Sequence, residues 1–489
     1  MNILLVYPDI EGVEHYGARK FYHGLAYLSA TVKRDGHQTA LYYADREPTR
    51  EQFLEAVSAA QADVVAFSST THQHPFVEKW AGWLKEAMPG LTLVSGGTHP
   101  TLSPEEVVSS PHWDAVCVGE GEYAFRELVQ CIAAGEPWDD VQNIWKRKGR
   151  EIIRNPLRPL ITNLDDIPFP DRELFDFGAL LAANSGWVDM MSGRGCPYQC
   201  SYCCNPGLQS RYKGLGKYVR FRSVPHVLAE IRDLQARYAV KTINFQDDTF
   251  TLDEKWTLEF CESYGREFQF PFWINTRVER LSEEVVAALA RAGCKGVRIG
   301  IESGNEELRR DILKRRMSND DIIAAFRRLR KHGLLAYTCN MLGVPGETRE
   351  MIRETIELNR RLEPDDLQFS VFYPYPMTEL HDTAVAKGYY VPHSDALSTY
   401  YSRASVLKLP TLTQEELAQE YDRFVALKDE LSMRRTHPWR YRAKKALRAL
   451  AGGDDARMDR MLAPWRKAKR LLRRKRNRHQ DTRTRSGQQ

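Results

Sequence analysis

The chain has no apolar run close to the about 20 residues that a membrane-spanning helix requires, so it is not expected to cross a membrane. Glycine and proline, at 31 and 24 of 489 residues, are too scarce for a fibrous or low-complexity protein. The N-terminal sequence MNILLVYP has no charged leader and no small-residue cleavage site, which predicts a first strand and not a signal peptide. We therefore expect a cytoplasmic protein whose nine cysteines stay reduced and form no disulfide framework.

Charge is unevenly distributed along the chain. The segment from Arg434 to Gln489 has 20 Lys and Arg but only 4 Asp and Glu, whereas the rest has 50 Lys and Arg and 61 Asp and Glu. Within this segment, Arg457–Arg478 has apolar residues at helical spacing and predicts a basic amphipathic helix. Such a helix can bind the anionic inner face of a membrane, contact RNA phosphates, or pack on the acidic body. Nucleic acid is the least favoured of these partners.

Strand and helix patterns alternate in the first part of the chain. They predict an α/β fold, a doubly wound (Rossmann-like) parallel sheet, in residues 1–140. Residues 141–186 are rich in proline and lack periodicity, which predicts a linker. The expected strands of the sheet are Ile3–Tyr7, Thr39–Tyr43, Asp63–Ser68, Leu91–Ser95 and Ala115–Val118.

A second series of strands and helices occupies residues 187–388. Six strand–helix units are too few for a closed barrel of eight, so they predict an open, partial (βα)6 TIM-like barrel. Residues 389–489 are expected to be a helical C-terminal extension that includes a helix over Thr411–Ser432 and the basic tail. The expected barrel strands are Val188–Met191, Thr242–Phe245, Phe272–Asn275, Gly296–Ile301, Ala336–Leu342 and Leu367–Phe372.

A cysteine cluster follows the first strand of this second series. The sequence GRGCPYQCSYCC begins at Gly193 and places Cys196, Cys200 and Cys203 at C-x3-C-x2-C spacing. Three thiolates on one loop suit a soft metal centre, and three ligands on a cubane iron–sulfur cluster leave one iron open. Zinc is the alternative, with Cys204 as a fourth ligand, but structural zinc sites normally use two separated pairs.

The motif and its place after the first barrel strand resemble the radical S-adenosylmethionine (radical SAM) superfamily. The resemblance covers about residues 187–388. It implies that Cys196, Cys200 and Cys203 bind a [4Fe–4S] cluster whose open iron binds SAM. Tyr202 supplies the aromatic residue of the family's C-x3-C-x-aromatic-C pattern.

The same resemblance implies further SAM contacts at the ends of the barrel strands. The family's usual Gly-Gly-Glu after the second strand is replaced here by QDDTF, which makes Asp247 and Asp248 the candidate contacts. Glu302 is expected at the rim, where a carboxylate can accept hydrogen bonds from the ribose. Gly343 begins a turn similar to the family's adenine-contacting segment. Together with Tyr202, these four residues form the predicted SAM site.

The N-terminal domain is similar to that of the cobalamin (B12)-binding radical SAM class. The motifs that carry this resemblance are GGTHPT after the fourth strand and GEGE after the fifth. The Asp-x-His-x-x-Gly motif that ligates cobalt in other cobalamin domains is missing, so the lower cobalt ligand is not assigned. The predicted cobalamin contacts are the small and polar edge residues Ser68, Ser69, Gly96, Gly97, Gly119 and Glu120.

Both resemblances together imply an enzyme, a cobalamin-dependent radical SAM methyltransferase. In that class a 5′-deoxyadenosyl radical removes a hydrogen atom from an unactivated carbon of the substrate. The substrate radical then takes a methyl group from methylcobalamin. Two alternatives stay open: a B12 radical SAM oxidative cyclase or rearrangement enzyme, and a zinc-stabilised binding module. The expected partners are a small-molecule substrate, with a lipid or isoprenoid as one option, and an electron donor such as flavodoxin or ferredoxin. No catalytic side chain is assigned.

Overall fold

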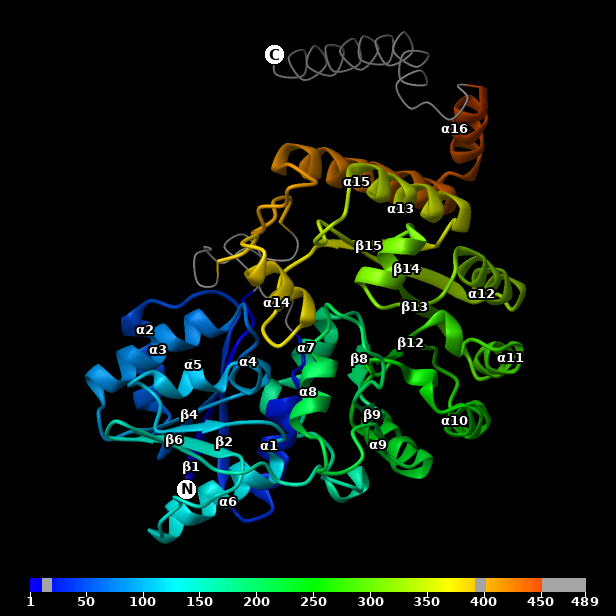
Figure 1. The fold of residues 1–489 in the computed structure, drawn as a ribbon. Helices are drawn as coiled ribbons and strands as arrows, with labels where there is room; N and C mark the ends of the chain where they lie inside the picture. The colour runs from blue at the N-terminus through cyan, green and yellow to red at the C-terminus, as the bar shows by residue number, and fades with distance from the viewer. Residues whose placement is uncertain (11–19, 392–401, 451–489) are drawn as a thin grey trace, which may run out of the picture. The chain divides into compact units, whose positions relative to one another are not determined.

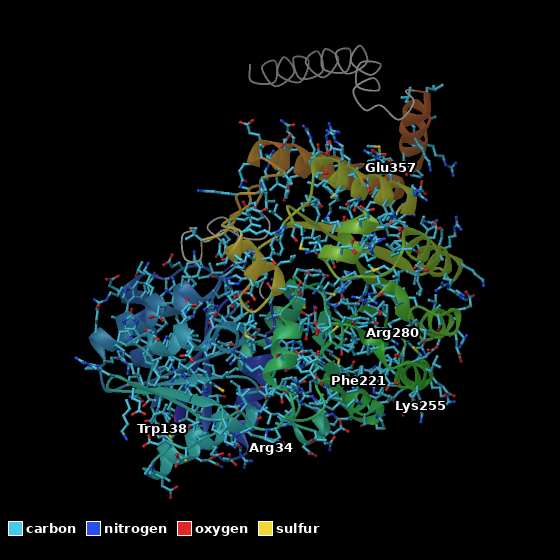
Figure 2. All side chains as sticks on the ribbon, in the orientation of Figure 1. Arg34, Trp138, Phe221, Lys255, Arg280 and Glu357 are labelled. Atoms are coloured by element: carbon cyan, nitrogen blue, oxygen red, sulfur yellow. The ribbon has the colours of Figure 1, made fainter. Side chains whose placement is uncertain are left out.

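The computed structural model describes residues 1–10, 20–391 and 402–450, and Figure 1 shows the fold. Figure 2 shows the side chains. Met1–Phe424 forms one compact unit and Val425–Gln489 forms a second. Within the described ranges, no helix is both long and apolar enough to cross a membrane. The predicted amphipathic helix Arg457–Arg478 lies outside the described residues.

A seven-stranded sheet forms the N-terminal part, in the order β2-β1-β3-β4-β5-β6-β7. Its first five strands pair in parallel, as predicted. Strands β1 and β3 are almost continuously buried, as expected when helices cover both faces of a sheet. The strands are β1 (Asn2–Pro8), β2 (Gln38–Ala44), β3 (Val64–Ser68), β4 (Thr92–Gly96), β5 (Ala115–Cys117), β6 (Ile144–Lys148) and β7 (Glu151–Arg154).

Helices cover both faces of this sheet (Figure 1). Apolar residues of α1 and α6 pack with one face, and those of α2, α3 and α5 pack with the other. The turn after β3 and the glycines after β4 and β5 therefore meet at one edge, the carboxyl edge. The helices are α1 (His23–Lys33), α2 (Arg50–Ala59), α3 (His74–Ala87), α4 (Thr98–Leu102), α5 (Pro104–Ser109) and α6 (Glu122–Ala134).

The hairpin β6–β7 falls in the segment that the sequence predicts to be a linker. Strand β6 pairs antiparallel with β5, so the predicted parallel sheet is extended on one side by an antiparallel hairpin. The physical reason for the missed hairpin is that β6 and β7 carry several charged side chains, as in the sequence WKRK. These charged side chains are largely exposed at the end of the sheet, where β7 is the edge strand, and they hide the apolar pattern of a strand.

A six-stranded parallel sheet forms the barrel part, in the order β15-β14-β13-β12-β11-β8. The open partial barrel is therefore confirmed, with β15 and β8 as its two edges. Helices α9 (Val224–Arg237), α10 (Glu254–Glu267), α11 (Glu283–Arg291), α12 (Asn319–Lys331) and α13 (Arg349–Leu362) connect the strands. The strands are β8 (Trp187–Met190), β11 (Thr242–Phe245), β12 (Phe272–Thr276), β13 (Cys294–Glu302), β14 (Leu335–Leu342) and β15 (Asp366–Val371).

Shorter elements complete the chain. Helix α15 overlaps the predicted helix Thr411–Ser432, but it begins and ends a few residues later in the chain. Two short strands, β9 and β10, pair antiparallel beside the cysteine loop. These elements are α7 (Phe177–Ala183), β9 (Gly193–Arg194), α8 (Asn205–Arg211), β10 (Arg220–Phe221), α14 (Glu379–Ala386), α15 (Gln414–Thr436) and α16 (Pro438–Leu450).

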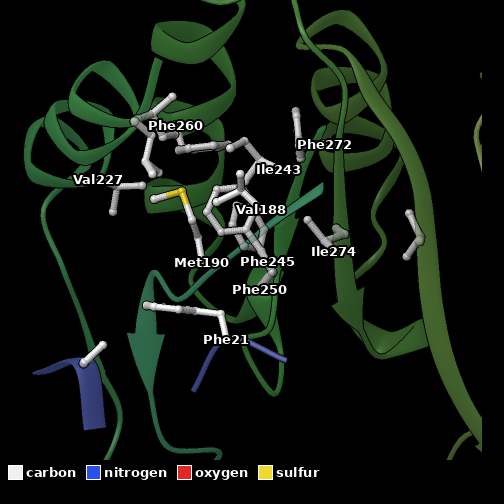
Figure 3. Close-up of a cluster of buried hydrophobic side chains, with 14 of the residues drawn as sticks. Phe21, Val188, Met190, Val227, Ile243, Phe245, Phe250, Phe260, Phe272 and Ile274 are labelled. Atoms are coloured by element: carbon white, nitrogen blue, oxygen red, sulfur yellow. The ribbon is translucent and has the colours of Figure 1, made fainter. Parts of the chain in front are cut away.

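One apolar core continues from the first sheet into the barrel. Phe21, just before α1, belongs to the same buried cluster as Met190 of β8, and Figure 3 shows these two side chains with their neighbours. A buried ion-pair triad joins the linker to the barrel, because Glu230 binds Arg172 at 2.8 Å and Arg222 at 2.5 Å. Burial acts to raise the pKa of Glu230, but the two guanidinium groups lower it to about 2. Arg172 and Arg222 also donate to the backbone carbonyls of Asp189 and Met191, so the triad holds the linker against the end of β8.

Candidate active site

The cysteine loop lies between β9 and β10, at the carboxyl end of β8. Pairing of Arg194 with Arg220 closes the base of the loop, and α8 begins directly after Cys204. All nine cysteines are free, as the sequence predicts. Cys200 is buried, whereas Cys196 and Cys203 are partly exposed. The loop therefore presents three unoxidised thiols near one another in sequence and at one edge of the barrel.

Each of these three sulfurs has a polar neighbour. The Thr249 hydroxyl lies 3.8 Å from Cys196 Sγ, and Arg277 Nη1 donates to Cys200 Sγ at 3.3 Å. The backbone N–H and side-chain amide of Asn205 both donate to Cys203 Sγ at 3.5 Å. Donors of this kind stabilise thiolates and tune iron–sulfur clusters. The donor set therefore fits a cluster bound by the three predicted cysteines.

Glu302 and Tyr202 meet at the end of β13. The Tyr202 hydroxyl donates to Glu302 Oε1 at 3.0 Å, and Arg315 donates to the Tyr202 hydroxyl at 3.2 Å and to the Gly300 carbonyl at 2.5 Å. Glu302 has a φ of 67°, a left-handed conformation that costs free energy in a non-glycine residue and is often found at functional sites. These two predicted SAM residues are thus held together beside the cysteine loop.

Asp247 and Asp248 have different surroundings. Asp247 is buried and accepts hydrogen bonds from the Ser192 backbone N–H at 3.1 Å and from its hydroxyl at 2.7 Å. Burial raises the pKa of Asp247 to about 6. Asp248 accepts from Asn205 Nδ2 at 3.1 Å and lines a cavity of about 430 Å³. Asp247 thus ties the ends of β8 and β11 together, whereas Asp248 faces open space.

Gly343 begins the turn after β14. Its N–H and that of Val344 donate to Glu347 Oε2 at 2.6 and 3.2 Å. Burial raises the pKa of Glu347 to about 8. Gly343 has a φ of 73°, which favours glycine. The turn is held by its own carboxyl group, and its backbone is shaped before any ligand binds.

A cavity of about 260 Å³ lies at the carboxyl edge of the first sheet. Five of the six predicted cobalamin residues line this cavity: Ser68, Gly96, Gly97, Gly119 and Glu120. Gly97 has a φ of 100°, and a Cβ at this position would come within 2.7 Å of Ser68 Oγ. The sixth residue, Ser69, is buried, and its hydroxyl has no hydrogen-bond partner among the described residues. This glycine cradle with an unsatisfied hydroxyl beside it fits a large ligand that approaches the backbone.

Glu120 links this cavity to the cysteine loop. Its carboxylate binds Arg194 at 3.0 Å and Arg220 at 2.8 Å, and it accepts from the Ile161 N–H at 3.1 Å. Burial acts to raise the pKa of Glu120, but the two arginines bring it below its ordinary value. Arg194 also binds Glu122 at 2.5 Å. Glu120 thus binds both strands that close the loop, β9 through Arg194 and β10 through Arg220. Arg194 precedes Cys196 by two residues.

Two larger cavities are lined by residues of both the N-terminal part and the barrel part. A cavity of about 460 Å³ is lined by Tyr7, Thr70, His72 and Thr98 from the first part, and by Tyr202, Cys203, Cys204 and Tyr375 from the second. Within it, His72 Nε2 lies 3.0 Å from the Tyr375 hydroxyl. The 430 Å³ cavity joins Gly97, Gly119 and Glu120 to Cys204 and Asp248. Both predicted cofactor sites therefore open onto shared space.

The sequence did not reveal the arginines around the cysteine loop. Arg194 lies inside the GRGC motif, so a positive charge near the cysteine loop could have been predicted from the sequence. Arg315 is 115 residues from Cys200, and no local pattern connects the two. Arg277 follows β12 and reads in the sequence as an ordinary strand end.

Comparison with known protein families agrees with this geometry. The family described as the radical SAM superfamily matches residues 190–358, and the B12 binding domain matches residues 21–129. An uncharacterized methyltransferase of Pyrococcus horikoshii is 30% identical over 423 residues, which cover 86% of this chain and 90% of that protein. An anaerobic magnesium-protoporphyrin IX monomethyl ester cyclase of Rubrivivax gelatinosus is 25% identical, over 78% of this chain and 69% of that protein.

A solved structure has the same fold. The radical SAM methyltransferase TsrM of Kitasatospora setae aligns with a TM-score of 0.66 at 17% identity, and the alignment covers 81% of this chain and 79% of that one. The family match supports the iron–sulfur expectation over the zinc alternative, and the cofactors it implies are a [4Fe–4S] cluster, SAM and cobalamin. The chain therefore belongs to the radical SAM superfamily of enzymes, as a member with an N-terminal B12-binding domain.

Proposed function

We propose that this chain is a cobalamin-dependent radical SAM enzyme that methylates an unactivated carbon of a small molecule. The observation that carries the proposal is the 430 Å³ cavity, which is lined both by Gly97 and Gly119 of the glycine cradle and by Gly195 and Cys204 of the cysteine loop. A transfer between two cofactors requires both to reach one substrate carbon. The methyltransferase of Pyrococcus horikoshii, similar over most of both chains, supports the same reaction class.

The side chains divide into three groups in this proposal. Cys196, Cys200 and Cys203 hold the cluster, and the glycine cradle with Ser68 and Ser69 admits cobalamin. Tyr202, Glu302, Asp248 and the Gly343 turn bind SAM, while Asp247 orients the ends of two strands through Ser192. When bound, the cluster with SAM supplies a carbon radical, and cobalamin supplies a methyl group.

The residues that line the 460 Å³ cavity can exclude water and orient a substrate. Ile10, Leu102 and Tyr7 give the 460 Å³ cavity an apolar side, which excludes water from a reactive substrate. His72 and Tyr375, joined at 3.0 Å, provide a polar pair that can orient a substrate oxygen or nitrogen. Glu120 keeps the cysteine loop against the first sheet, so that both parts of the cavity keep their alignment.

A direct test uses SAM with a trideuteromethyl group, a low-potential reductant and a metabolite extract. Methylation predicts a product that carries the label, together with 5′-deoxyadenosine and S-adenosylhomocysteine. Cys200→Ala serves as the control and should form none of the three. If 5′-deoxyadenosine forms without sustained S-adenosylhomocysteine or labelled product, methylation is excluded. That second outcome would favour an oxidative cyclase, a candidate supported by the similarity to the Rubrivivax gelatinosus cyclase.

The basic tail and the electron donor belong to the proposal as well. The excess of Lys and Arg between Arg434 and Gln489 supports binding to an anionic membrane surface, where a lipid or isoprenoid substrate would be available. A ferredoxin or flavodoxin would supply the electron. A flotation assay with phosphatidylglycerol vesicles tests whether the tail binds membranes. It compares the full chain with a variant that lacks residues 434–489. Equal flotation of both proteins would remove the membrane proposal.

A further inference from the structure

Two arginines bring their guanidinium groups to the sulfur of Cys200. Arg277 Nη1 donates to Cys200 Sγ at 3.3 Å, and Arg315 Nη1 lies 3.7 Å from the same sulfur. The exposed fractions of Arg277, Arg315 and Cys200 are only 6%, 5% and 6%. In addition, Nε of each arginine has no hydrogen-bond partner among the residues that the structure describes. Buried cations with unused donors beside a thiol indicate an environment built for negative charge.

Arg277 is held in this position from three directions. It follows β12, its guanidinium stacks 3.8 Å from the ring centroid of Tyr198, and its Nη2 binds Glu279 Oε1 at 2.6 Å. Tyr198 belongs to the cysteine loop itself, between Cys196 and Cys200. The geometry therefore fixes the distance between the charge of Arg277 and the Cys200 sulfur, because the same loop supplies both the sulfur and the stacking partner.

The two arginines differ in their other partners. Arg315 also donates to the Tyr202 hydroxyl and to the Gly300 carbonyl, so a change there would disturb the predicted SAM site. Arg277 instead contacts Tyr198, Glu279 and the sulfur. Its replacement therefore removes a positive charge beside the sulfur without changing a contact of the predicted SAM site.

We propose that Arg277 raises the reduction potential of the iron–sulfur cluster by stabilising negative charge on Cys200 Sγ. The inference rests on the cluster assignment in the proposed function. Reduction of a [4Fe–4S] cluster by one electron, taken from an external low-potential donor, adds one negative charge. A cation and a hydrogen bond at a ligating sulfur favour the more negative form. Arg277 is thus a positioning residue that tunes electron transfer, and it is distinct from the groups that contact substrate.

The experiment is a redox titration of the reconstituted full-length chain, followed by the electron paramagnetic resonance signal of the reduced cluster in the absence of SAM. Arg277→Met is expected to disfavour reduction about tenfold, which is about 59 mV for a one-electron couple. The matched control is Arg280→Met. Arg280, labelled in Figure 2, donates to the Tyr198 hydroxyl at 2.8 Å, so it contacts the same tyrosine ring system without donating to Cys200. The reduction potential of the cluster in Arg280→Met should equal that in the wild type.

A second variant tests the sign of the effect. Glu279→Gln removes the anion that partly neutralises Arg277, so the potential should rise. This variant keeps Arg277 and decides the matter even if Arg277→Met cannot hold iron. A fall or no change in Glu279→Gln, or an unchanged potential in iron-replete Arg277→Met, would overturn the inference. Absence of iron from the wild type would instead overturn the cluster assignment and the proposed function with it.

Discussion

Replacement of Glu120 by glutamine tests whether a buried ion network holds the cysteine loop against the first sheet. The change keeps the side-chain shape but removes the charge that binds Arg194 and Arg220. Loss of one partner from a buried ion pair costs about 3–5 kcal/mol of unfolding free energy. Glu120 retains 17% side-chain exposure and Arg194 keeps Glu122, so the lower end, about 3 kcal/mol, is expected. Most of that cost comes from Arg220, whose side chain is only 6% exposed.

Urea unfolding of the purified chain, followed by tryptophan fluorescence, measures this loss as a lower transition midpoint at unchanged slope. Glu105→Gln is the matched control, since Glu105 also binds an arginine with both carboxylate oxygens. That pair is exposed, at 58% for Glu105 and 48% for Arg154, and is expected to contribute little. If Glu120→Gln lowers the midpoint no more than Glu105→Gln, the argument that the network anchors the loop is wrong.

Three further predictions concern the ligand sites. Gly97→Ala should abolish cobalamin binding, because φ at this position is 100° and a Cβ would crowd Ser68. Binding is measured by absorbance after gel filtration. The control Gly90→Ala should bind cobalamin normally, because a Cβ there would have no atom within 4 Å. The wild type is expected to lose unfolding free energy as the pH rises from 4.5 to about 8, and Glu347→Gln should not show this loss. The raised pKa means that the folded state holds a proton there that the unfolded state releases, so full stability is present below pH 4.5 and lost through pH 8. Equal pH profiles of the two proteins in thermal unfolding would contradict this. Glu302→Gln should weaken SAM binding at least several-fold in equilibrium dialysis while iron content stays constant, and unchanged affinity would remove Glu302 from the SAM site.

The sequence predicts the architecture well because its signals are local. Apolar runs such as Ile3–Tyr7 and the spacing of Cys196, Cys200 and Cys203 depend on neighbours within a few residues, so both can be read directly. The hairpin β6–β7 was missed because its charged strands resemble a loop. The parts of the site that depend on long-range contacts were also out of reach. Nothing near Arg277 in the sequence indicates that its guanidinium meets a sulfur 77 residues away.

Glu120 has partners that its sequence motif does not indicate. Its place in the GEGE motif predicted a cobalamin contact, and it does line the 260 Å³ cavity. The structure adds that its carboxylate is engaged by two arginines of the barrel part. Charge pairing between segments about 100 residues apart cannot be recognised without the fold, since any of many arginines is an equally suitable partner in the sequence.

The metal content of the chain tests the central claim most directly. The protein would be produced with cobalamin, purified without oxygen, reconstituted with iron and sulfide, and analysed for iron, cobalt and zinc. We expect about four irons and about one cobalt per chain, with iron lost and cobalt kept in Cys200→Ala. Iron without cobalt would contradict the two-cofactor mechanism, and zinc without either would contradict the assignment of the cysteine loop.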